Sequence, residues 1–236
     1  MSYSVVYKDI GCKDYKEAWD YQAEIFTKLV AIKKQGAQPG NPLLNNLPGT
    51  LIFVEHPHVY TLGKSGSENN LLLDNIQLRA KDASFYRIDR GGDITYHGPG
   101  QIVGYPIFDL EYIKIGLKDY IYRLEEAIIR TIGEFGLTAS RLEGGTGVWL
   151  DPEINGKARK ICAIGVKASR YVTMHGFAFN VNTDLSYFNY INPCGFTDKG
   201  VTSLEKELGS RQDFSSVKSI VKRNLQEVFD LEWTNQ

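Results

Sequence analysis

The chain has 236 residues, of which 42% are apolar and 23% are charged, as in an ordinary globular protein. Its 27 basic and 28 acidic residues give a formal charge of −1, so the chain lacks the basic excess of a nucleic-acid-binding protein. Because no apolar run approaches the ~18 residues of a membrane span and the first residues do not resemble a signal peptide, we expect a cytoplasmic protein that binds neither nucleic acid nor membrane.

The hydrophobic pattern predicts helices and strands in mixed order. Asp14, with Glu17 three residues later, has the pattern of a capping box, and apolar residues behind it repeat at helical spacing to about Lys34. A second helix stops near Gly136, a natural C-cap residue. In chain order we expect a strand at 3–7, a helix to about residue 34, strands at 50–55, 85–88 and 101–108, a helix at 117–135, strands at 147–150, 160–167 and 172–180, and helices at 203–208 and 215–229.

This order of elements lacks the strict alternation of a doubly wound sheet. The prediction is an α/β (α+β) fold in which helices pack on a mixed β-sheet. Residues 36–49 are rich in Gly, Pro and Asn, which is typical of a surface loop rather than of a domain boundary. We therefore expect one domain that spans residues 1–236.

The densest cluster of unusual residues is the stretch Arg90–Gln101 (RGGDITYHGPGQ). Its four glycines allow backbone to approach a ligand closely, and we expect a loop between two strands. A decorated hairpin loop is the simplest interpretation. The many polar side chains among the glycines favour a binding or catalytic site instead. The spacing matches neither a dinucleotide fingerprint nor a P-loop.

The three cysteines, Cys12, Cys162 and Cys194, are sparse and form no CxxC pair. This spacing argues against a disulfide framework and against a zinc site. Cys194 stands between Pro193 and Gly195, where a thiol has little steric cover, whereas structural thiols are usually buried. A nucleophilic cysteine needs exposure and a positive neighbour that lowers its pKa. Cys194 is therefore a candidate nucleophile, although most cysteines are inert.

Lys160 opens an otherwise apolar strand. Strand alternation places Lys160, Cys162 and Ile164 on one face, and Arg159 and Ala163 on the other. A lysine at a strand end ordinarily reaches solvent. If its face lines a pocket, however, Lys160 becomes the electrostatic partner of a nearby thiolate.

The histidines are weaker candidates. His56 and His58 are two residues apart, but no acidic or thiol ligand accompanies them at metal-site spacing. We expect them to pack or to line a pocket, and we predict no metal site and no cofactor. Gly176, after His175, indicates close approach of backbone or ligand in that strand.

Together these segments resemble the octanoyl-carrier-protein-dependent octanoyltransferases of lipoate biosynthesis, a family often called lipoate-protein ligase B. The resemblance spans about residues 50–205, and the stretch Arg90–Gln101 is its most specific part. The remaining motifs follow in order: His56-Pro-x-Val-Tyr-Thr-x-Gly63, Lys160-Ile-x-Ala-Ile-Gly165, His175-Gly-Phe-Ala-x-Asn180, Ile191-x-Pro-Cys-Gly195 and Val201-Thr-Ser-Leu204.

The resemblance implies a biotin/lipoyl protein ligase-like catalytic domain with a tunnel for an acyl chain. It implies that Cys194 carries the acyl group as a thioester and that Lys160 lowers the pKa of Cys194. Cys162 departs from the family pattern, which has a small residue such as alanine there, and would put a second thiol near the site that could form a disulfide with Cys194. The implied substrate-binding residues are Arg90, Gly91, Gly92, Asp93, Ile94, Thr95, Tyr96, His97, Ala163, Ile164, Gly165, Gly176, Phe177 and Ala178.

The implied reaction moves octanoyl from acyl carrier protein to a lysine of a lipoyl domain, without ATP. The implied acceptors are the lipoyl domains of 2-oxoacid dehydrogenase complexes and the glycine cleavage H protein. We also expect Ile161, Ile164, Phe177 and Phe179 to supply an apolar wall for the acyl chain.

Three other functions stay open on the same residues. An ATP-dependent lipoate or biotin ligase would show nucleotide-dependent turnover. An amidotransferase would use the cysteine but refuse acyl carrier protein as donor. A non-enzymatic acyl-binding module would bind octanoate without covalent labelling. The pairing of Cys194 with Lys160 favours the transferase over all three.

Overall fold

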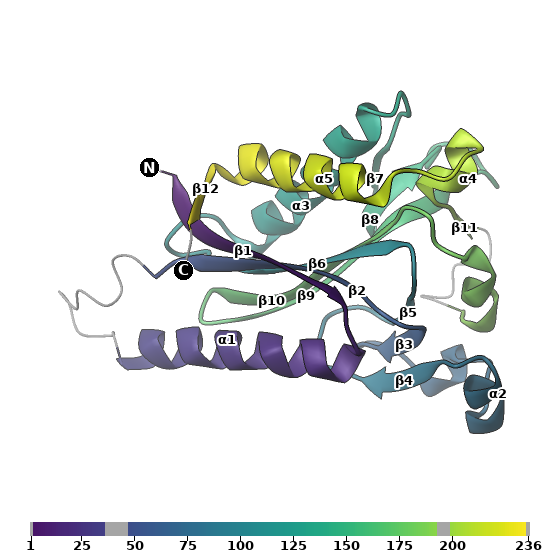
Figure 1. Cartoon of the computed structure of the whole chain (residues 1–236), viewed down its shortest axis with the longest axis horizontal. Coiled ribbons are helices and arrows are strands. Elements are labelled where there is room, and N and C mark those ends of the chain that lie inside the picture. The colour runs from purple at the N-terminus through teal and green to yellow at the C-terminus, as the bar shows by residue number, and fades with distance from the viewer. Residues whose placement is uncertain (1, 36–46, 193–198, 235–236) are drawn as a thin grey trace.

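The computed structural model describes residues 2–35, 47–192 and 199–234 (Figure 1). In these ranges the large sheet has the order β12-β1-β2-β6-β10-β9-β8-β7, and β11 pairs with β9. Its strands are β1 (Tyr3–Cys12), β2 (Gly49–Glu55), β6 (Gln101–Ile107), β7 (Ser140–Leu142), β8 (Gly145–Leu150), β9 (Arg159–Ser169), β10 (Val172–Asn180), β11 (Gly200–Val201) and β12 (Leu231–Thr234).

The large sheet is mixed. β1 runs parallel to both β12 and β2, and β11 runs parallel to β9. The pairs from β2 through β6, β10, β9 and β8 to β7 are antiparallel. A small second sheet has the order β4-β3-β5, formed by β3 (Val59–Leu62), β4 (Ser84–Arg87) and β5 (Ile94–His97).

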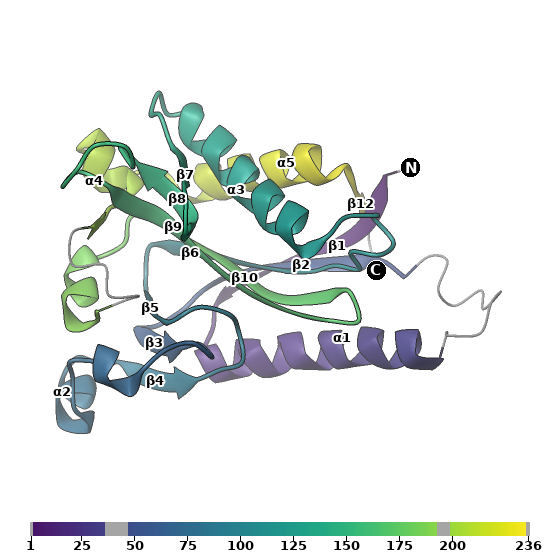
Figure 2. The same ribbon diagram turned by 180° about the vertical axis from the view of Figure 1, so that it is seen from behind.

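Helices cover both faces of the large sheet, with α1 on one face and α3 and α5 on the other (Figures 1 and 2). All of β6 and β10 is consequently buried, which explains why these strands read as continuous runs rather than alternating ones. The helices are α1 (Tyr15–Gln35), α2 (Asn75–Ala80), α3 (Leu117–Gly133), α4 (Leu204–Leu208) and α5 (Phe214–Phe229), with 3-10 turns η2 (Glu68–Asn70) and η3 (Leu185–Tyr190).

Two apolar cores lie on the two faces of the sheet. The core under α3 and α5 contains Leu124, Ile128, Val221, Ile161 and Phe179. The core under α1 contains strand residues of β6 and β10 that face the helix residues Ala18 and Phe26. Among the described residues, no helix is both long and apolar enough to cross a membrane.

The cap of α1 is confirmed in part. The Asp14 carboxylate accepts from the backbone N–H of Lys16 at 2.8 Å and of Glu17 at 3.3 Å, as an N-cap residue does. The Glu17 carboxylate lies 3.5 Å from Lys13 Nζ and thus takes part in an ion pair with its neighbour.

Several element boundaries differ from the prediction. The first strand extends to Cys12, and α3 ends at Gly133, one turn before the left-handed Gly136. The stretch Arg90–Gln101 is not one loop, because it contains β5, which pairs with β3. The predicted loop 36–49 falls mostly outside the described residues.

Candidate active site

A cavity of about 310 Å³ lies between the two sheets. The large sheet contributes Val103, Tyr105 and Ala178, which belong to the core under α1, and β5 contributes Ile94 and His97 from the small sheet. Most of the predicted site residues line this cavity: Arg90, Gly92, Asp93, Ile94, Thr95, His97, Lys160, Ala163, Ile164, Gly165, Gly176, Phe177 and Ala178.

Two predicted residues among those that the structure describes, Gly91 and Tyr96, are not in that lining. Gly91 donates its backbone N–H to Val166 O at 2.9 Å and so joins the motif to β9. Tyr96 packs in the small-sheet core, where its hydroxyl lies 2.7 Å from His58 Nδ1. Cys194 lies outside the described residues.

Close backbone packing explains the glycines around Arg90. A Cβ on Gly63 would come within 2.3 Å of Gly92 O, and one on Gly165 would come within 3.0 Å of both Arg90 Cδ and Gly91 O. The Arg90 guanidinium is mostly buried and donates to Thr61 O at 2.8 Å and to Thr61 Oγ1 at 3.0 Å. The arginine therefore fastens the motif to β3 while it faces the cavity.

Asp93 has a structural contact as well as a place in the cavity wall. Its carboxylate accepts from Ile94 N and from Asn70 Nδ2, both at 2.7 Å. Asn70 O in turn accepts from Asn192 N at 2.9 Å. Asp93 thus helps to hold Asn70, and through Asn70 also Asn192, beside the stretch Arg90–Gln101.

His97 is held by a chain of amide side chains. Because Thr202 O can only accept, Asn180 Nδ2 donates to it at 3.0 Å, and Asn180 Oδ1 accepts from Gln101 Nε2 at 2.8 Å. Gln101 Oε1 then accepts from His97 Nδ1 at 2.8 Å. Burial lowers the pKa of His97 to about 3, so the ring is neutral at physiological pH and carries its proton on Nδ1.

Aromatic rings continue this polar cluster behind His97. Tyr15, the first residue of α1, stacks on His97 with a centroid distance of 5.9 Å and also contacts His56. His56 Nδ1 donates to Lys13 O, and its Nε2 accepts from Tyr105 OH, both at 2.8 Å. Burial lowers the pKa of His56 to about 4. His56 therefore packs as a neutral residue, as expected.

His175 has an uncommon backbone conformation, with φ of +63°. Its Nε2 lies 2.9 Å from Asp89 Oδ1, and its ring lines the cavity. Burial is the main cause of the lowered pKa of His175.

Among the described residues, no group of three or more His, Cys, Asp and Glu side chains has the arrangement of a metal site.

Because of a bulge in β9, the side chains that face the cavity differ from those that simple alternation predicts. Val148 pairs with Cys162 but Trp149 pairs with Lys160, so Ile161 is an extra residue. A bulge breaks the alternation of side chains along a strand. Lys160 and Ala163 consequently line the cavity, whereas Ile161 and Cys162 both lie in the core under α3 and α5.

The predicted placement of Cys162 beside the site is therefore wrong. The Cys162 side chain is fully buried in that core, and burial raises the pKa of its thiol. Ile161 and Phe179 belong to the same core and do not line the cavity, so only Ile164 and Phe177 of the expected apolar wall face it.

Lys160 lies where three strands meet. Its Nζ is 4.6 Å from the centroid of the Trp149 ring in β8, a cation–π distance. On the other side Val201 of β11 pairs with it. Ile191 and Lys199, which precede and follow the segment that contains Cys194, also line the cavity.

The cavity is also lined by residues that the sequence does not mark as parts of a site or marks only as members of a motif. Tyr15 falls in the predicted helix that follows Asp14, and Trp149 falls in the predicted strand at 147–150, and nothing in either pattern indicates a site. Gln101 and Asn180 appear in the motifs, and their pairing across 79 positions becomes visible only in the fold. The remaining lining residues are Val103, Tyr105, Gly144, Gly145, Thr146, His175, Phe188, Ile191, Lys199, Gly200 and Val201.

Comparison with known proteins gives a consistent family. Residues 14–226 match the model of the lipoyl protein ligase A/B catalytic domain. An octanoyltransferase of Parabacteroides distasonis is 57% identical over 223 residues, which cover 94% of this chain and 97% of the relative. An octanoyltransferase of Christiangramia forsetii is 52% identical over 233 residues and 98% of each chain.

Solved structures show the same fold at low sequence identity. A bipartite lipoate protein ligase of Thermoplasma acidophilum has a TM-score of 0.67 at 13% identity and covers 100% of this chain and 86% of its own. The lipoate complex of LipL1 from P. falciparum has a TM-score of 0.68 at 10% identity, covering 98% and 66%. These likenesses confirm the predicted ligase-like mixed α/β fold.

Proposed function

The chain belongs to the octanoyltransferases of the lipoyl protein ligase A/B family and is an acyltransferase, and from this membership we propose that it transfers octanoyl through a thioester on Cys194. The proposed donor is octanoyl-acyl carrier protein. The proposed acceptor is the lysine of a lipoyl domain, as in 2-oxoacid dehydrogenase complexes and the glycine cleavage H protein. The proposal places the reaction at the start of protein lipoylation.

The observation that carries this proposal is the position of Lys160. Its side chain lines a largely apolar cavity that is also lined by Ile191 and Lys199, which precede and follow Cys194 in the sequence. The ammonium of Lys160 stabilises the charged form of a thiol close to it and so lowers the pKa of that thiol. The cavity walls supply the apolar surface for an eight-carbon chain, at about 0.8 kcal/mol for each buried CH₂.

The first step is thioester exchange. The Cys194 thiolate attacks the octanoyl carbonyl, a new C–S bond forms, and the donor C–S bond breaks. The carrier leaves as a thiolate that takes up the proton of the Lys160 ammonium, which leaves Lys160 as a neutral amine. Because one thioester replaces another, the step is nearly thermoneutral and requires no ATP. Backbone N–H groups near residues 163–165 are candidates to hold the oxyanion.

The second step forms the amide. The acceptor ε-amine attacks the enzyme thioester, the C–N bond forms, and the C–S bond to Cys194 breaks. The amine loses one proton, for which Lys160 is the candidate acceptor as the thiolate is regenerated. The products are the octanoyl-lysine amide and free carrier thiol, so atoms and charge balance.

The test is intact-mass measurement after incubation with octanoyl-acyl carrier protein. The parent enzyme is expected to gain one octanoyl group that hydroxylamine removes, and Cys194→Ser should gain none. Cys12→Ser and Cys162→Ala are the matched controls and should be acylated. Full transferase turnover by Cys194→Ser would exclude the proposed intermediate.

The same assay separates the other functions. A ligase would need ATP and free acid, whereas the proposed transferase should work with ATP omitted. An amidotransferase would move octanoyl from an octanoylated carrier protein, or lipoyl from a lipoylated one, but would leave octanoyl-acyl carrier protein unchanged. Binding of octanoate without any mass increase would indicate a binding module.

A further inference from the structure

The backbone of Lys160 is bound by β11, a short strand that pairs with β9 beyond the point where the longer strand β10 ends. β10 pairs with β9 only as far as Phe179 opposite Cys162. Beyond this point β11 takes the same side of β9, with Val201 opposite Lys160. Thr202 N then donates to Lys160 O at 3.0 Å. The backbone of Lys160 is therefore bound directly by the residue that follows β11.

Thr202 uses every polar group it has. Its side chain is completely buried and does not line the cavity. Its carbonyl accepts from Asn180 Nδ2 at 3.0 Å, and its hydroxyl donates to Glu207 Oε1 at 2.5 Å. Thr202 thus joins Lys160 on β9, Asn180 at the end of β10 and Glu207 in α4.

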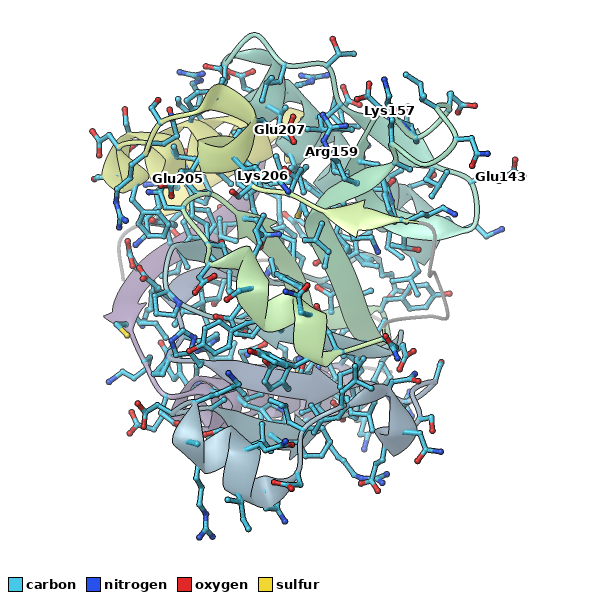
Figure 3. All side chains as sticks on the ribbon, turned by 90° about the vertical axis from the view of Figure 1, so that its right-hand side faces the viewer. Glu143, Lys157, Arg159, Glu205, Lys206 and Glu207 are labelled. Carbon is cyan, nitrogen blue, oxygen red and sulfur yellow. The ribbon has the colours of Figure 1, made fainter. Side chains whose placement is uncertain are left out.

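Glu207 is in turn fixed by Arg159, the residue before Lys160. Arg159 Nε and Nη2 donate to the two carboxylate oxygens of Glu207, both at 2.6 Å, and these two side chains meet beside α4 in Figure 3. Arg159 Nη1 also donates to Asp151 at 2.5 Å. Paired, charge-assisted hydrogen bonds of this kind fix both distance and orientation.

We propose that Thr202 is a positioning residue for Lys160, with its hydroxyl anchored on Glu207. This proposal rests on the proposed catalytic role of Lys160. Without the anchor, β11 is released from α4 and the carbonyl of Lys160 loses a fixed donor. The Lys160 ammonium is then held less firmly at its place in the cavity wall, and small displacements of a catalytic group have large effects on rate.

The primary experiment compares Thr202→Val with Thr202→Ser. The rate of Cys194 acylation by octanoyl-acyl carrier protein is followed from about pH 6 to pH 10. Thr202→Val, which keeps the shape but loses the hydroxyl, should acylate about tenfold more slowly near neutral pH, with KM for the donor little changed. In this variant the acidic limb of the pH profile should shift to higher pH. The reason is that a displaced Lys160 ammonium stabilises the Cys194 thiolate less and so leaves the thiol with a higher pKa. Thr202→Ser should restore the parent profile.

A second pair of variants separates positioning from fold stability. Glu207→Ala and Asp151→Ala each remove one carboxylate partner of Arg159, but only Glu207 contacts Thr202. Glu207→Ala should reproduce the shift of the pH profile, and Asp151→Ala should not. This pair also decides the question if Thr202→Val fails to fold.

The possible failures are distinct. A normal pH profile for folded Thr202→Val or Glu207→Ala, whatever the fall in Tm, would overturn the positioning role. A shift of equal size in Asp151→Ala would also overturn it, since the effect would then belong to Arg159 alone. A parent enzyme that is not acylated, or a Lys160→Met variant with the parent profile, would instead reject the proposed function.

Discussion

Cys162 shows how the surroundings of one residue decide its chemistry. One residue away from the cavity wall, it lies in a core of aliphatic and aromatic side chains, and burial raises the pKa of its thiol. We predict that Cys162→Ala lowers the free energy of unfolding by about 1–2 kcal/mol, as small deletions in a packed core do, while turnover stays within twofold of the parent. Urea unfolding and the transferase assay test both parts. A tenfold loss of acylation would show that this thiol takes part in the reaction.

At the scale of elements, the N-cap of α1 connects stability with the cavity, because Tyr15 follows Asp14 directly and lines the wall. Asp14→Ala is expected to reduce the free energy of unfolding by about 1 kcal/mol, with recovery in Asp14→Ser. Glu17→Ala serves as the control, since its exposed ion pair with Lys13 should contribute little. Chemical denaturation gives the comparison. Equal losses in the Ala variants would instead indicate a complete capping box.

The elements also show where sequence patterns succeed. The predicted strand at 172–180 has the observed bounds, and α5 begins one residue before the predicted start, because long apolar runs and helical stripes are local features. The extra residue at Ile161 is not local, since it depends on the pairing of β9 with β8. Simple alternation therefore placed Cys162 on the cavity wall in error. The small sheet was missed for a related reason, as β5 lies within a glycine-rich stretch.

At the scale of the whole molecule, folding brings neutral histidines together from separate segments. Burial lowers the pKa of His56 to about 4 and of His97 to about 3, below the ordinary value of about 6.5. Each histidine is therefore neutral when folded but takes up a proton on unfolding below about pH 6.5. Their contribution to stability is present above that pH and is lost as the pH falls towards the folded values, by up to about 1.4 kcal/mol per pH unit for each residue.

The variant His97→Gln separates the effect of the histidine on the pH dependence of stability from the effect of the carboxylates. Urea unfolding of the parent protein between pH 7.5 and pH 4.5 should show a steeper loss of stability than that of His97→Gln. His58→Gln is the control, because His58 is only partly buried and should change the slope less. Identical slopes for the parent and His97→Gln would contradict a neutral, buried His97.

The parallel pairing of β1 with β12 sets Tyr3 opposite Leu231 and Val6 opposite Thr234. Tension applied ahead of β1 and behind β12 pulls the two strands lengthwise past each other. In this shear geometry all the hydrogen bonds between them share the load, whereas a peeled pair would lose them singly. The pair of β1 and β12 should therefore resist a pulling force more strongly than a pair of strands that is peeled apart. In a single-molecule stretching experiment, the first rupture is expected at this pair, and the strands of the large sheet that line the cavity, β6, β8, β9 and β10, should separate only after it has given way.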